Sequence, residues 1–280
     1  MTVLTAGVAA AGCDRAATVT AEPAVPLAST GRCQVIGPGP GGTGGEPGAD
    51  PSDERDRLRA ACERALPVVT QVWPGWTGTA HIEVSPTALD AGTAAHVVGF
   101  ARDGEPARDD RIVVAPGLTG ELSPAGIDVV LRHELTHLAM RSTGTAPLPL
   151  WASEGLAIHL GYASVDGPRR ERRPELERLR ARVESESWTG TVPGSALFED
   201  SADRSDAYSA AWLGIEVLIE RLGRDRLVDA MAPQAGEPSL ADVATALTGD
   251  ERTEQFLGSL GVSRQWMEER WRAELVLRTS

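Results

Sequence analysis

The motif His133-Glu134-Leu135-Thr136-His137 constrains this chain more than any other feature of its sequence. It lies within an apolar, helix-compatible run from Ile127 to Met140. Residues four apart lie on one face of an α-helix, one turn above the other, so both imidazoles can reach a single ion. Glu134 follows the first histidine directly and can serve as a base without being a ligand. The motif therefore predicts a helix that carries two ligands of one metal ion.

Zinc is the metal that this pattern suits best. It accepts neutral imidazole, and its catalytic sites use three protein ligands with water in the fourth position. A carboxylate base beside a metal-activated water is the arrangement of a zinc hydrolase. We therefore expect Zn²⁺ and a third protein ligand elsewhere in the chain.

Glu154 is the best candidate for the third ligand. It is a lone carboxylate in Leu150–Leu160, a second helix-compatible run of apolar and small residues. A buried carboxylate is costly unless a positive group or a metal accompanies it. The turn-forming segment Thr143–Pro149 allows the second helix to fold back beside the first. His159, five residues after Glu154, is a rival ligand, although it is turned partly away from the same face.

With these residues in place, the chain resembles the gluzincins, typified by thermolysin and the zinc aminopeptidases, and most of all the compact bacterial peptidase MA-like group. The resemblance covers roughly residues 79 to 222 and is carried by Arg111–Pro116, the H-E-x-x-H motif, Trp151-x-x-Glu154-Gly155-Leu156-Ala157 and Tyr208. It implies a zincin-like fold, with His133, His137 and Glu154 as zinc ligands and Glu134 as catalytic base. Thermolysin-like enzymes carry an acid four residues after the third ligand, where this chain has Ile158.

The resemblance implies a zinc metallopeptidase that hydrolyses a peptide or protein substrate, with Glu134 taking the proton of the attacking water. Tyr208 is a candidate donor to the oxyanion, because related gluzincins place a tyrosine or histidine there. Tyr208 also opens an apolar helical stripe, so a core residue is the other interpretation, and Tyr162 is a weaker candidate donor. Two other functions stay open: a non-catalytic, zinc-stabilised surface binding lipoprotein, and an amidase acting on cell-wall peptides.

The first residues resemble a bacterial export signal. Residues 1–12 are mostly apolar and small, and Ala10-Ala11-Gly12-Cys13 resembles a lipobox, in which Cys13 would be lipidated. This run is too short to span a bilayer. We expect an exported protein, either secreted or held at the extracellular face of the cell membrane only through its lipid anchor. A truncated secretory signal or membrane anchor is the alternative.

Residues 14–50 are rich in Ala, Thr, Pro and Gly, which predicts a flexible tether. In an oxidising compartment, Cys33 and Cys62 would be an even pair of cysteines. Their disulfide would close a loop of about 30 residues and stabilise the fold by roughly 3–4 kcal/mol on the chain-entropy model. Cys62 also lies on an apolar helical stripe, so a plain buried thiol is the other interpretation.

The periodicity predicts an α+β lobe over residues 51–143 and a mainly helical lobe over 147–280. The first lobe should contain a helix from Pro51 to about Gln71, kinked or divided at Pro67, and a helix with the H-E-x-x-H motif that begins at Ser123-Pro124. Its expected strands are 79–85, 94–101 and 111–115, with Asp103-Gly104 as a hairpin signal. From the resemblance, we expect the strand before the motif helix to be an exposed edge that could pair with an extended peptide.

Composition narrows the range of partners. The 280 residues carry a net charge of -13, which argues against nucleic acid as a general partner. The basic run Arg169–Arg173 is expected to be a solvated helix start, with contact to an anionic polymer or lipid headgroups as the alternative. His81 and His96 fall in the predicted strands and are expected to be structural or exposed. The oligomeric state does not follow from the sequence.

Overall fold

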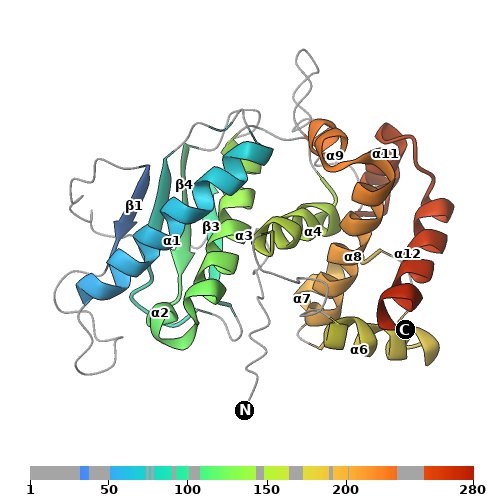
Figure 1. Cartoon of the computed structure of the whole chain (residues 1–280), viewed down its shortest axis with the longest axis horizontal. Helices are drawn as coiled ribbons and strands as arrows, with labels where there is room; N and C mark the ends of the chain where they lie inside the picture. Colours follow the sequence, from blue (N-terminus) through green and yellow to red (C-terminus); the bar gives the residue numbers. More distant parts are fainter. Residues whose placement is uncertain are drawn as a thin grey trace. The chain divides into compact units, whose positions relative to one another are not determined.

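The structure is a computed structural model that describes residues 32–37, 51–73, 76, 79–89, 93–100, 108–142, 148–163, 173–188, 192–200, 202–231 and 249–280. Within these residues the chain combines one four-stranded sheet with many helices, which confirms the α+β class (Figure 1). Its contacts divide the chain into two compact units. The first contains the elements from β1 to α3, and the second contains those from α4 to α12.

The sheet of the first unit has the strand order β1-β2-β4-β3. Its strands are β1 (Cys33–Ile36), β2 (Ala80–Val84), β3 (Ala95–Phe100) and β4 (Arg108–Val114). β2 pairs in parallel with β1 and β4, and β3 runs antiparallel to β4. Ala80, Ile82 and Val84 alternate with more exposed residues along β2, so one face of the strand is buried in the core.

The strand before the motif helix is not the exposed edge that we expected from the resemblance. β4 is a central strand, in which Ile112 lies in register with Ile82 of β2 and Val97 of β3. Ile112 and Val114 are completely buried, so the face of β4 that carries these two side chains belongs to the core. β3 is therefore an edge strand of the described sheet. Its pairing with β4 shifts register between Val98 and Phe100.

Helices α1 (Pro51–Val72) and α3 (Pro124–Ser142) pack against each other, and the short α2 (Leu118–Glu121) contacts both. α1 continues through Pro67, so the proline does not divide it. The buried positions of α1 form the expected helical stripe: Leu58, Ala61, Cys62, Ala65, Leu66 and Val69. This stripe holds α1 against α3 and β1, which gives the motif helix a packed support.

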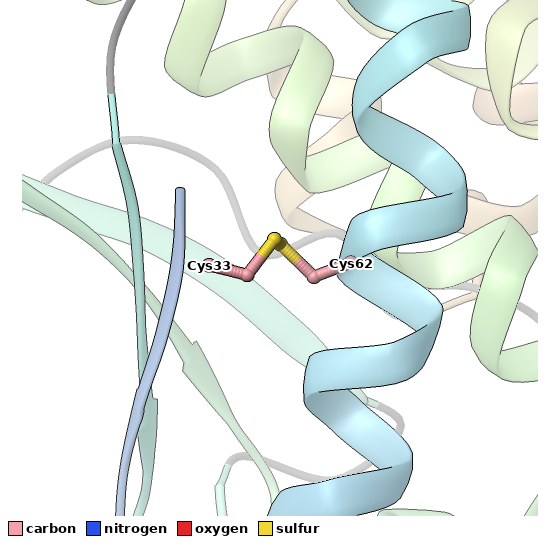
Figure 2. The surroundings of a disulfide bond; sticks show 2 residues. All are labelled: Cys33 and Cys62. Atoms are coloured by element: carbon pink, nitrogen blue, oxygen red, sulfur yellow. A yellow bond between two sulfur atoms is a disulfide. The ribbon is translucent and has the colours of Figure 1, made fainter. Parts of the chain in front are cut away.

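A disulfide joins Cys33 of β1 to Cys62 of α1 (Figure 2). The expectation of a flexible tether is therefore wrong for Cys33–Ile36, because these residues pair with β2 and are bonded to α1. Both sulfur-bearing side chains are completely buried. The export signal, Cys13 and the rest of the expected tether, apart from Arg32 and Gly37, lie outside the described residues.

The regular elements described in the second unit are all helices. Its helices are α4 (Leu150–Gly161), α6 (Arg173–Glu184), α7 (Ala196–Glu199), α8 (Arg204–Leu222), α9 (Arg224–Met231), α11 (Gly249–Ser259) and α12 (Arg264–Thr279). α8 is the central helix and packs against α4, α6, α7, α9 and α12. Within the described part of the chain, no helix is both long and apolar enough to cross a membrane.

Buried tryptophans link the helices of this unit. Trp151 of α4 donates to the hydroxyl of Thr253 of α11 at 3.1 Å, and Trp271 of α12 donates to the carbonyl of Ala210 of α8 at 3.0 Å. Burying large aromatic side chains with their polar atoms satisfied stabilises the core. Of the Arg169–Arg173 run, only Arg173, the first residue of α6, is described, and the Asp103-Gly104 signal lies outside the described residues.

Candidate metal centre

The motif helix begins where the sequence predicts it. The hydroxyl of Ser123 accepts a hydrogen bond from the amide of Gly126 at 3.2 Å, and Pro124 occupies the first helical position. Most side chains from Ile127 to Met140 are buried. A helix surrounded by core on most sides has little freedom to shift, which suits a helix that has to hold metal ligands.

Arginine–aspartate pairs hold both ends of α3. Before the motif, Asp128 accepts a hydrogen bond from Arg64 of α1 at 2.7 Å and forms an ion pair with Arg132 at 3.6 Å. Burial lowers the pKa of Arg132, and the charge of Asp128 opposes that effect. After the motif, Arg141 donates to both carboxylate oxygens of Asp110 in β4, at 2.9 and 3.1 Å. Hydrogen bonds between a guanidinium group and a carboxylate restrict both the distance and the angle between the two groups. These pairs therefore fix α3 relative to α1 and the sheet.

His133 and His137 direct their Nε2 atoms toward each other across one helical turn. The two nitrogens lie 3.1 Å apart, and the ring planes meet at 75°. Two imidazole nitrogens on one tetrahedral zinc ion would lie about 3.3 Å apart, given zinc–nitrogen bonds of about 2.0–2.1 Å. The separation therefore matches two ligands of one ion. It also matches an N–H···N hydrogen bond, so the metal interpretation needs a third ligand.

Glu154 of α4 supplies that third group. One potential ligand atom from each of His133, His137 and Glu154 lies within 4.8 Å of the others. Glu154 is only 4% exposed, so its carboxylate would be costly to keep charged without a partner or an ion. Two imidazole nitrogens and one carboxylate oxygen are donors that divalent transition metals accept. The three residues predicted as ligands can therefore hold a metal ion.

The histidines outside this group have other surroundings. Nδ1 of His159 lies 2.6 Å from a carboxylate oxygen of Glu216 in α8. His81 lies in β2 and His96 in β3, and both are partly buried. Among the described residues, the group that could hold a metal includes none of these three histidines. The structure therefore favours Glu154 over its rival His159 as the third ligand.

Glu134, the expected base, follows His133 on α3 and is 1% exposed. Burial strengthens the interactions of a carboxylate with nearby protons and charges. Its place in the chain, directly after His133, brings it near the candidate metal group without making it a member of that group.

α8 approaches α4 very closely beside Glu154. A Cβ atom on Gly155 would overlap the carbonyl oxygen of Ala211 and would lie 2.6 Å from a side-chain carbon of Ile215. Only glycine permits this contact. Tyr208 lies three residues before Ala211 and thus on the same face of α8. In the sequence, Gly155 stands out only as part of a motif, because its packing role depends on a helix more than fifty residues away.

Tyr208 is buried at 5% exposure, and its ring meets Phe198 edge-on with centroids 5.2 Å apart. The ring is therefore part of the core, as its apolar stripe predicts. Whether its hydroxyl also acts in catalysis stays a prediction. Tyr162, the weaker candidate, caps the carboxyl end of α4.

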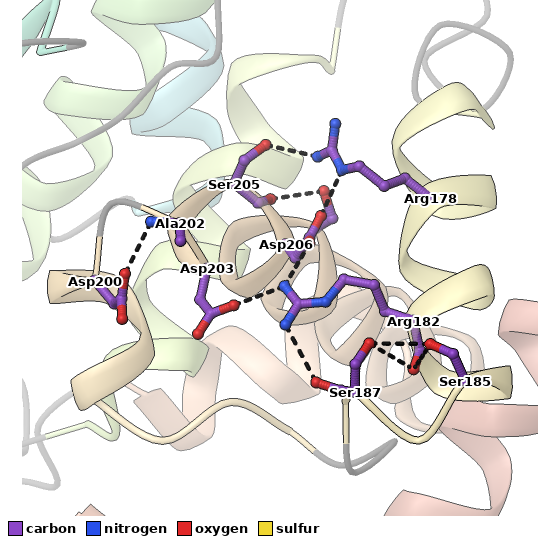
Figure 3. Close-up of polar contacts among 10 residues, drawn as sticks. Arg178, Arg182, Ser185, Ser187, Asp200, Ala202, Asp203, Ser205 and Asp206 are labelled. Carbon is purple, nitrogen blue, oxygen red and sulfur yellow. Dashed lines mark hydrogen bonds and ion pairs between the residues drawn. The ribbon is translucent and has the colours of Figure 1, made fainter.

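A cluster of ion pairs around Asp206 holds the first turn of α8 (Figure 3). Asp206 lies two residues before Tyr208. Arg178 and Arg182 of α6 each donate to one oxygen of the buried Asp206, at 2.7 and 2.8 Å. Hydrogen bonds with Asp206, and then with Asp203, raise the pKa of Arg182. Because both oxygens of Asp206 are engaged, α6 fixes where α8 begins.

Comparisons of the chain with protein-family models, with curated proteins and with solved structures found no match.

Proposed function

We propose that this protein is a zinc-dependent metallopeptidase with a zincin-like fold and a gluzincin active site. The observation that carries the proposal is the group His133, His137 and Glu154, whose ligand atoms lie within 4.8 Å of one another. Two histidines and one glutamate are the three protein ligands of thermolysin-type catalytic zinc sites. Intact Glu134 supports catalysis rather than a structural ion, because a structural site needs no base.

The proposed chemistry divides between the ion and the chain. A zinc ion held there would acidify a water molecule and polarise the carbonyl of the scissile bond. Glu134 takes the proton of the attacking water and passes it to the leaving amine. The hydroxyl of Tyr208 donates a hydrogen bond to the developing oxyanion. The packing of α8 on Gly155 then sets the separation between Glu154 and Tyr208.

A peptide or protein is the proposed substrate. β3 supports this, because it is an edge strand of the described sheet and pairs only through β4 there. An extended peptide can add to such an edge through main-chain hydrogen bonds, which read the backbone rather than the side chains.

We further propose that the protein is exported and lipid-anchored through Cys13 at the extracellular face of the membrane, or secreted. The disulfide between Cys33 and Cys62 supports an oxidising compartment, since such bonds are rare in the cytosol. The acyl chains would be the only membrane contact, and nucleic acid is not a proposed partner.

The decisive experiment is Glu134→Gln. The variant should keep its metal and its fold but lose hydrolysis, because an amide cannot accept the proton of the water. Metal content is measured by elemental analysis, and hydrolysis is measured with a mixed peptide library and with cell-wall peptides. Glu121→Gln, at an exposed position of α2, is the matched control and should stay fully active.

Two outcomes would contradict the proposal. If only cell-wall peptides are cleaved at an amide bond, the protein is an amidase with the same chemistry. If wild type and Glu134→Gln are equally inactive on all peptides while both bind a surface partner, the protein is a binding module.

A further inference from the structure

A hollow of 670 Å³ lies in the second unit, at the carboxyl end of α8. It is lined by His159 of α4, by Ile219 and Leu222 of α8, and by Arg224–Arg226 at the start of α9. Its volume falls within the range of about 300–1,000 Å³ that is usual for small-molecule sites. None of these residues belongs to the metal group.

The imidazole of His159 is held in a defined orientation at this hollow. Its Nδ1 contacts a carboxylate oxygen of Glu216 at 2.6 Å, so Nδ1 carries the proton of that hydrogen bond. Nε2 is therefore the ring atom left for a ligand. The side chain is 23% exposed, whereas that of Glu216 is 10% exposed.

Glu216 is itself fixed by a row of alternating charges. Its other carboxylate oxygen lies 3.5 Å from Arg278 of α12. Arg278 contacts Glu274 at 3.2 Å, and Glu274 contacts Arg270 at 2.6 Å. Partly buried networks of this kind hold their members rigidly. The network therefore preorganises His159, and preorganisation lowers the entropic cost of binding a ligand.

Two arginines also line this hollow. Arg226 is exposed and has no ion pair within the part of the chain that the structure describes. Arg224 has a contact of 3.5 Å with Asp225, whose side chain is 92% exposed and therefore neutralises it weakly. In a chain of net charge -13, this local excess of guanidinium groups attracts anions. Guanidinium also matches the planar, two-oxygen geometry of carboxylates and phosphates.

We propose that this hollow is a binding site for a small organic oxyanion. The oxyanion accepts hydrogen bonds from Arg224 and Arg226, beside the imidazole of His159. A short apolar chain on the ligand packs against Ile219 and Leu222. The free carboxylate of a peptide and the phosphate group of a small phosphate ester share this chemistry. The proposal does not depend on metal or on peptidase activity.

Two small probes separate these two sources. The full chain is titrated calorimetrically with N-acetyl-leucine, with butyl phosphate, and with N-acetyl-leucinamide, which lacks the charge. We expect saturable binding of at least one anion and none of the amide. The anion that binds more tightly identifies the source. Binding should persist after the metal has been removed with a chelator.

Two charge-neutralising variants locate the site. Arg226→Gln should weaken the binding of the anion by about tenfold or more, since it removes a charge-assisted hydrogen bond. Arg221→Gln is the matched control, because Arg221 lies near the same end of α8 but stacks over Trp266, 4.3 Å from its ring centroid. It should leave the affinity almost unchanged.

Three results would overturn the proposal. They are failure of both anions to show saturable binding, equal weakening by Arg221→Gln and Arg226→Gln, and loss of binding when metal is removed. Equal weakening would show attraction to overall charge, and loss with the chelator would show that the anion binds at the metal.

Discussion

Because Gly155 lies so close to α8, we predict that Gly155→Ala destabilises the protein. The added Cβ would overlap the carbonyl oxygen of Ala211 and would lie 2.8 Å from its carbonyl carbon. Cβ contacts below 3.0 Å are essentially never seen in real structures. The obstacle is backbone of a central, buried helix, so it cannot rotate away as a side chain would. Either α4 or α8 has to move.

The expected cost follows from two opposing effects. Adding a methyl group to a packed core typically costs about 1–3 kcal/mol, and rigid surroundings favour the upper end. Replacing glycine by alanine inside a helix stabilises by about 1 kcal/mol. We therefore expect the free energy of unfolding to fall by about 2 kcal/mol, which changes the unfolding equilibrium by about 30-fold. Because Glu154 is the adjacent residue, the affinity for metal should also fall.

Urea denaturation of the metal-free protein, followed by tryptophan fluorescence, measures the free energy of unfolding. Gly258→Ala in α11 is the control, because a Cβ there meets nothing within 4 Å and should stabilise by up to about 1 kcal/mol. Gly214→Ala in α8 is an intermediate case, since its nearest obstacles are side-chain atoms of Trp151 and Met267 at 3.2 and 3.3 Å. If Gly155→Ala is as stable as wild type, or no less stable than Gly214→Ala, the reasoning fails.

The remaining predictions concern the metal, the oxyanion and the disulfide. Alanine at His133, His137 or Glu154 should strip the metal after mild dialysis, whereas His159→Ala should retain it; full retention by Glu154→Ala in elemental analysis would refute the ligand set. Tyr208→Phe should lower kcat by about 10²-fold, with metal content and KM little changed. A nearly unchanged kcat would leave Tyr208 as a core residue whose lost hydroxyl costs about 1 kcal/mol of stability. Replacing Cys33 and Cys62 by serine should destabilise the first unit by about 3.5 kcal/mol on the chain-entropy model, measured by denaturation. A difference below about 1 kcal/mol would show that the disulfide constrains the unfolded chain little.

The sequence alone determined the features that depend on local periodicity. His133 and His137 share one helix face because residues four apart must do so, and Ser123-Pro124 marks the start of that helix through its own backbone chemistry. The α1 stripe followed from the same 3.6-residue spacing. Glu154 was a candidate ligand because it is a lone carboxylate in an apolar helical run, and the resemblance to gluzincins implied the same role.

Only the tertiary structure decided which distant partners meet. The strand Cys33–Ile36 could not be predicted from its Gly- and Pro-rich surroundings in the sequence. Its stability comes from pairing with β2 and from the disulfide to α1. β4 became central because β3 covers its second side. His159 was left as a rival ligand until Glu216, fifty-seven residues away, proved to be its partner. The need for glycine at position 155 likewise depends on the carbonyl group of Ala211, which lies on a different helix. Helical spacing is a property of neighbouring residues, whereas strand order, ion pairs and close packing depend on segments that only the folded chain brings together.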